Sequence, residues 1–112
     1  FGVNGVLQDV VFHLAERTTD FGFILVLPDG TLNSQGSRFW DAMPECCNFG
    51  GTAIDDVGYI AGLMSEAMAI YAVDPDRIRL AGHSNGGYMS YRYACEQPVR
   101  IDRIAVLAGS TF

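Results

Sequence analysis

Residues 77–88 form the most informative segment of this chain and read Arg-Ile-Arg-Leu-Ala-Gly-His-Ser-Asn-Gly-Gly-Tyr. Within it, residues 82–86 (Gly-His-Ser-Asn-Gly) have the G-x-S-x-G pattern that is typical of a nucleophile elbow. In that elbow a buried strand turns sharply into a helix, the two glycines avoid clashes that a Cβ would cause, and the serine hydroxyl points outward. The sequence predicts the strand over 78–81 and the helix over 85–95. We therefore interpret Ser84 as a candidate nucleophile.

A serine hydroxyl is a weak nucleophile near neutral pH, so it needs a base, an acid that orients the base, and donors for the oxyanion. In the elbow geometry one donor is the backbone N–H of the residue after the serine, which is Asn85 here. The Asn85 side chain is not needed for that role. Gly86 and Gly87 are expected to let the helix lie close to neighbouring strands.

The N-terminal part of the chain predicts one helix and one strand. Asn4 is expected to cap a helix from about Gly5 to Thr18. The continuous apolar run at 23–27 predicts a strand covered on both faces, as in a parallel sheet. Asp29 and Gly30 then end the strand with turn residues. The apolar residues of the helix recur at helical spacing on one face: Val6, Leu7, Val10, Val11 and Leu14.

The middle of the chain predicts an irregular loop over 31–51, followed by a helix. Thr52 and Asp55 have the spacing of a capping box. Asp55 and Asp56 are interpreted as acids at the start of the helix rather than as catalytic acids, since the helix dipole favours them there. Residues 74–76 predict a turn, and 104–107 predict a last strand. The apolar stripe expected on the helix comprises Val57, Ile60, Ala61, Met64, Met68 and Tyr71.

The predicted order is helix, strand, loop, helix, strand, helix, strand. This alternation indicates an α/β fold with a mostly parallel sheet and flanking helices. We expect residues 1–112 to form a single domain, and an incomplete one.

Composition excludes several classes of function. The chain has 13 acidic residues against seven arginines and a net charge of −6. Nucleic-acid binding is therefore not expected, because it needs a basic face. No run of 18 apolar residues is present, so no membrane span is expected. We expect no metal, since the cysteines and the two histidines fit no zinc pattern. No cofactor is expected either.

The three cysteines leave two interpretations open. In the first, either Cys46 or Cys47 forms a disulfide with Cys95, which would indicate an oxidising compartment. In the second, all three cysteines remain thiols. The sequence does not choose between them.

The rest of a catalytic triad is missing from the sequence. His83 adjoins the serine, so its side chain leaves the turn in another direction. His13 lies upstream of the serine, whereas in the fold that uses this elbow the triad residues follow the chain order Ser, then Asp or Glu, then His. After Ser84 the acids are Glu96 and Asp102, and no histidine follows. We therefore expect the triad acid and histidine to lie outside this chain.

Several segments together resemble the secreted polyhydroxybutyrate depolymerase and feruloyl esterase family of α/β-hydrolases. Pro28-Asp29-Gly30, Trp40 and the adjacent cysteines also match the pattern of that family. The matching segments are 55–60 (Asp-Asp-Val-Gly-Tyr-Ile), 73–78 (Val-Asp-Pro-Asp-Arg-Ile), 81–91 (Ala-Gly-His-Ser-Asn-Gly-Gly-Tyr-Met-Ser-Tyr) and 94–96 (Ala-Cys-Glu).

The resemblance implies an extracellular serine carboxylesterase that acts through an acyl-enzyme on a polyhydroxyalkanoate-type polyester or a feruloyl or cinnamoyl ester. Ser84 and the Asn85 N–H carry over from the family, and the second oxyanion donor lies at or before Phe1-Gly2. The family sheet also implies a further strand between 23–27 and 78–83. We therefore expect the 112-residue piece alone to be poorly folded and inactive.

Two alternatives to the esterase remain open: a serine peptidase of the same fold, and a non-catalytic module that keeps its elbow for packing. Trp40 either lines an acyl pocket or covers an edge of the core. Met64 and Met68 are interpreted as core filling. Oligomeric state is not predicted.

Overall fold

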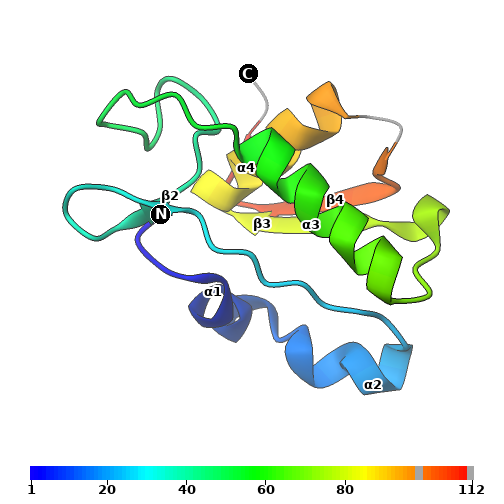
Figure 1. Cartoon of the computed structure of the whole chain (residues 1–112). Helices are drawn as coiled ribbons and strands as arrows, with labels where there is room; N and C mark the ends of the chain where they lie inside the picture. The colour runs from blue at the N-terminus through cyan, green and yellow to red at the C-terminus, as the bar shows by residue number, and fades with distance from the viewer. Residues whose placement is uncertain (98–99, 111–112) are drawn as a thin grey trace.

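The structure is a computed structural model that describes residues 1–97 and 100–110 (Figure 1). Its centre is a strand–helix–strand unit. The strands β3 (Arg79–His83) and β4 (Arg103–Leu107) pair in parallel, and the helix α4 (Asn85–Glu96) lies between them in the chain. The register runs from Arg79 opposite Arg103 to His83 opposite Leu107. These bounds confirm the predicted strands and helix around Ser84 to within about two residues. The larger parallel sheet remains a prediction.

The core lies between α4, the helix α3 (Asp56–Ile70) and the loop that precedes α3. Tyr93 is fully buried, and its hydroxyl donates to the sulfur of Met64 at 3.4 Å. Met64 thus fills the core edge as predicted. The buried cluster consists of Ala42, Val57, Ile60, Met89 and Tyr93.

The start of α3 differs from the predicted capping box. Asp55 is itself the N-cap and accepts from the backbone N–H of Gly58 at 2.8 Å. The helix therefore begins three residues later than a cap at Thr52 would place it. The apolar stripe is confirmed at Val57 and Ile60, but Tyr71 follows the last helical residue and is exposed.

The predicted helix over 5–18 is broken. Asn4 caps α1 (Gly5–Phe12), as expected, by accepting from the N–H of Leu7. His13 then adopts a left-handed conformation that ends the helix, and Asp9 accepts from the backbone N–H groups of the next two residues. A 3₁₀ turn over Ala15–Arg17 and the short α2 (Thr18–Phe21) follow.

The N-terminal apolar residues are exposed, contrary to prediction. No residue of α1 is buried, and Val6 and Val10 are 67% and 64% exposed. Residues 23–27 form no strand, and Ile24 and Val26 are also exposed. A strand forms only where a neighbouring strand pairs with its backbone N–H and C=O groups, and no strand of the described residues pairs with this segment. Figure 1 shows it as an extended trace between the α1–α2 region and β3.

The predicted irregular loop over 31–51 contains a hairpin. β1 (Thr31–Leu32) pairs antiparallel with β2 (Arg38–Phe39). The Asn33 side chain closes the turn by accepting from the N–H groups of Gln35 and Ser37 at 3.0 and 2.9 Å.

Candidate active site

Ser84 is the single residue between β3 and α4, and its backbone has a conformation that non-glycine residues rarely adopt. Its φ is 52° and its ψ is −119°. Its N–H donates to the carbonyl of Leu107 at 2.8 Å, which extends the β3–β4 ladder by one bond. Its carbonyl accepts from Gly87 and Tyr88 in the first turn of α4. The sheet and the helix thus hold a sharp turn at this serine.

The glycines around Ser84 have different roles. A Cβ on Gly82 would overlap the backbone carbonyl of Gly86, so only glycine fits there. A Cβ on Gly87 would lie 2.7 Å from Cγ1 of Val106 on β4, so Gly87 permits close helix–strand packing as predicted. For Gly86 the prediction was wrong, because the nearest atom to an added Cβ would be the Trp40 Nε1 at 3.9 Å. The elbow therefore requires Gly82 and tolerates a side chain at 86.

The turn presents backbone donors beside the serine. Among the described residues, no acceptor bonds the backbone N–H of Asn85 or of Gly86, as is usual in the first turn of a helix. The Asn85 N–H is the predicted oxyanion donor. The Gly2 N–H, near the expected second donor, donates to the carbonyl of Arg38 at 2.7 Å instead.

Neither histidine is placed as a base for Ser84. His83 is the last residue of β3, and no described hydrogen bond joins it to the serine. His13 is exposed at the end of α1, where its Nδ1 lies 3.5 Å from Glu16. The acids after Ser84 form ion pairs with arginines, Glu96 with Arg92 at 2.8 Å and Asp102 with Arg79 at 3.1 Å.

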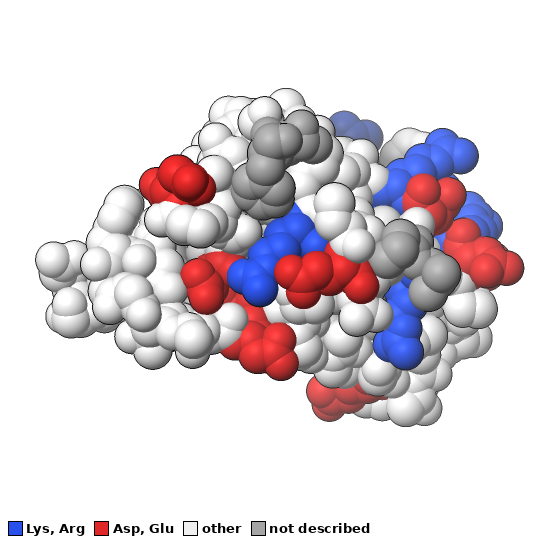
Figure 2. All heavy atoms as spheres, turned by 90° about the horizontal axis from the view of Figure 1, so that it is seen from above, with Lys and Arg blue, Asp and Glu red and all other residues white. Residues whose placement is uncertain are grey.

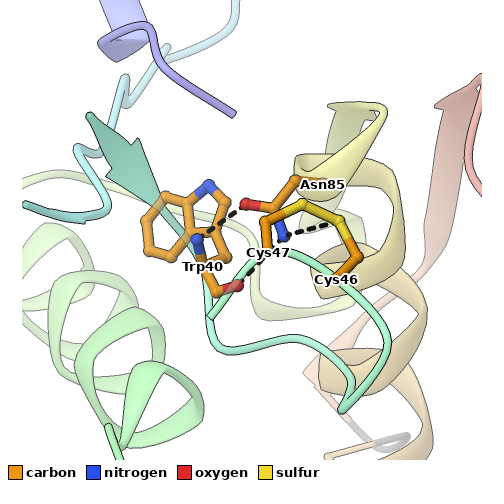
Figure 3. Close-up of a disulfide and its surroundings, with 4 residues drawn as sticks. All are labelled: Trp40, Cys46, Cys47 and Asn85. Atoms are coloured by element: carbon orange, nitrogen blue, oxygen red, sulfur yellow. Dashed lines mark hydrogen bonds between the residues drawn. A yellow bond between two sulfur atoms is a disulfide. The ribbon is translucent and has the colours of Figure 1, made fainter. Parts of the chain in front are cut away.

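Trp40 lies beside the elbow, held by the side chain of Asn85 (Figure 3). The Trp40 N–H donates to Oδ1 of Asn85 at 2.7 Å, and Nδ2 of Asn85 donates to the Trp40 carbonyl at 3.0 Å. The indole stacks on Tyr59 with centroids 6.2 Å apart. This role of the Asn85 side chain was not predicted from the sequence, because its partner is 45 residues away.

The cysteines match neither open interpretation. Cys46 and Cys47 form a disulfide with each other, and Cys95 is a free, exposed thiol near the end of α4. The bridge to Cys95 is absent since its possible partners are already joined. Figure 3 shows the Cys46–Cys47 disulfide beside Asn85, whose Nδ2 lies 4.0 Å from the Cys46 sulfur.

A second anchor of the loop is a buried acid. Asp56, 2% exposed, accepts from the Asp41 N–H at 2.6 Å, and Arg92 donates to the Asp41 carbonyl. Burial raises the pKa of Asp56 above its usual range, although the bond from Asp41 opposes the rise. The pKa of Arg92 is raised by the hydrogen bond that the Arg92 guanidinium donates to Glu96. Asp56 is thus a helix-start acid, as interpreted, that also fixes the loop. Figure 2 shows acidic and basic side chains interleaved on the face of the molecule that is seen from above.

One cavity of the surface lies away from Ser84. A cavity of about 430 Å³ lies between the β1–β2 hairpin and residues 48–54. Neither Ser84 nor Trp40 lines it, so the acyl-pocket role of Trp40 stays a prediction.

Within residues 1–97 and 100–110, no group of three or more His, Cys, Asp or Glu side chains is arranged to hold a metal ion. No helix in the same ranges is long and apolar enough to cross a membrane.

Comparison with known proteins finds two similar proteins that are named as a feruloyl esterase and a putative esterase. The chain is 35% identical over 98 residues to feruloyl esterase B of Piromyces equi, which covers 88% of this chain and 17% of that protein. It is 33% identical over 70 residues to "Putative esterase NocK" of Nocardia uniformis subsp. tsuyamanensis, which covers 62% of this chain and 20% of that protein. The chain thus spans about one fifth of the length of these relatives. No family model matches it, and no solved structure matches it.

Proposed function

We propose that the protein is a serine carboxylic ester hydrolase with Ser84 as its nucleophile, and that residues 1–112 are part of an α/β-hydrolase catalytic domain. The observation that carries the proposal is the backbone of Ser84, which has a φ of 52° between a strand and a helix. Such strained residues persist where the surrounding structure over-determines them, and they cluster at functional sites. The similarity to two proteins named as esterases favours an ester over a peptide amide as the substrate.

In the proposed mechanism the Ser84 hydroxyl attacks the ester carbonyl and passes its proton to a histidine base outside this chain. The oxyanion accepts from the Asn85 N–H. The alcohol leaves with that proton, and water then cleaves the acyl-enzyme to release the acid and restore the serine. No cofactor takes part.

We further propose that the acyl group is a feruloyl or cinnamoyl group, on the name of the Piromyces relative. A polyhydroxyalkanoate-type polyester is the other substrate that the sequence resemblance implies. An extracellular location belongs to the same proposal. Turnover of methyl ferulate, hydroxybutyrate oligomers, p-nitrophenyl esters and peptide amides by the full-length protein would order these substrates.

The nucleophile is tested by Ser84→Ala in the full-length protein. We expect the acylation burst and fluorophosphonate labelling to vanish, and kcat to fall at least about 1,000-fold. The matched control is Ser90→Ala, since the buried Ser90 hydroxyl donates to the Gly86 carbonyl on the same helix. This control should keep its labelling. Unchanged turnover in Ser84→Ala would overturn the proposed function.

A further inference from the structure

The Asn85 side chain is built into the elbow more firmly than a residue that supplies only a backbone N–H needs to be. It is 0% exposed, although it belongs to the first turn of α4. Its carboxamide uses both of its ends on one residue, because Oδ1 accepts from the Trp40 N–H and Nδ2 donates to the Trp40 carbonyl. Asn85 thus pairs with Trp40 as a neighbouring strand would.

This pairing requires an amide at position 85. A carboxylate would place an oxygen against the Trp40 carbonyl, and an alanine would leave both Trp40 backbone groups without Asn85 as their partner. Figure 3 shows the Trp40 backbone on the loop and the Asn85 carboxamide on α4 facing each other.

The segment that Asn85 holds is fixed independently at its next residue. The Asp41 N–H donates to Asp56 at the start of α3, and the Asp41 carbonyl accepts from Arg92 on α4. Two side chains from different helices thus make residue 41 a rigid support. Through Trp40, this support reaches the residue that directly follows Ser84.

We infer that the Asn85 carboxamide is a positioning group, which holds the Ser84–Asn85 peptide so that its N–H is aimed at the oxyanion. The inference rests on the proposed function. Ser84 has a positive φ, a conformation that persists only where neighbouring contacts enforce it. The sheet fixes the Ser84 N–H, and α4 fixes the Ser84 carbonyl. The two hydrogen bonds between the Asn85 carboxamide and the Trp40 backbone, called the clamp below, fix the Asn85 side of the peptide.

The test compares Asn85→Ala with Asn48→Ala in the full-length protein. Asn48 is an amide in the loop that carries Trp40, and it donates to the Asp41 side chain and to the Thr52 carbonyl rather than to Trp40. Its replacement leaves in place the two bonds of the Asp41 backbone that support Trp40. Misplaced catalytic groups and lost oxyanion donors each reduce the rate by about 100-fold or more. Since the N–H is displaced rather than removed, we expect kcat of Asn85→Ala to fall about 10- to 100-fold, with KM changed less than about threefold. Asn48→Ala should keep kcat within about threefold.

Fluorophosphonate labelling separates the two proposals. If the clamp acts as inferred, Asn85→Ala still labels once per chain at Ser84, but more slowly. Wild-type kcat in Asn85→Ala, or equal losses in both variants, would overturn the inference. Absence of labelling in the wild type would instead overturn the proposed function. If Asn85→Ala does not fold by circular dichroism, Asn85→Asp replaces it, because Asp keeps the volume and the acceptor for the Trp40 N–H. A lowered kcat there supports the clamp, and an unchanged kcat contradicts it.

Discussion

Two regions of this chain are similarly apolar in sequence and differ in burial. The region around the elbow, from Phe39 to Leu107, contains all the described residues of the buried cluster. The N-terminal region, residues 3–27, has an equally clear apolar pattern and buries none of its α1 residues. An apolar pattern therefore predicts which face of an element can be buried, whereas actual burial requires another segment that packs against this face. The elbow region carries its partners nearby in sequence, as a strand–helix–strand unit.

The largest effect should come from Gly82→Ala, which tests whether the elbow region depends on one close backbone approach. The new Cβ would overlap the Gly86 carbonyl, and backbone cannot move aside as a flexible side chain can. We expect a loss of more than about 3 kcal/mol of unfolding free energy. Urea unfolding of the full-length protein measures it.

Gly86→Ala is the matched control, from the same motif. Its Cβ would have no neighbour closer than 3.9 Å, and alanine favours the helix, so we expect a change between zero and about 1 kcal/mol of added stability. Equal losses at positions 82 and 86 would contradict the different roles assigned to the two glycines.

The next effect compares the two regions directly. Met89→Ala empties a site in the core and should cost about 2–5 kcal/mol. Val10→Ala removes atoms that are already exposed on α1 and should change stability by less than about 0.5 kcal/mol. Denaturation midpoints of the two variants measure the difference. A cost above about 1 kcal/mol for Val10→Ala would show that the α1 face is covered in the full-length protein, and the contrast between the regions would fail.

The same contrast explains what sequence could predict. The elbow was predictable because its signals are local: a glycine where backbones touch, an apolar strand before it and a helix after it. The clamp between Asn85 and Trp40 carries no local signal, since nothing in either residue's neighbourhood indicates the other. The strand predicted over 23–27 was wrong because its ladder depends on a neighbour that the described residues do not supply.

The smallest effect concerns the buried carboxyl of Asp56 and its dependence on pH. Burial raises the folded-state pKa of Asp56 above that of the unfolded chain, which is about 3.9. The folded state therefore binds the proton more tightly than the unfolded state does. Stability from this group is fully present below the unfolded pKa and declines as pH rises through the folded pKa. Asp41 and Asp55 add to the rise, whereas the Arg92 guanidinium opposes it.

Asp56→Asn removes this titration while keeping an oxygen that can accept from the Asp41 N–H. At pH 3 the variant and the wild type should be close in stability, because both then carry a neutral side chain at position 56. As pH rises from about 4, the variant should gain on the wild type, and the gap should stop growing above the folded pKa of Asp56. Urea midpoints measured across this range follow the gap. Parallel curves would instead show that the hydrogen bond from Asp41 and the Arg92 guanidinium together balance the burial of the carboxylate, so that its pKa is the same in the folded and unfolded states.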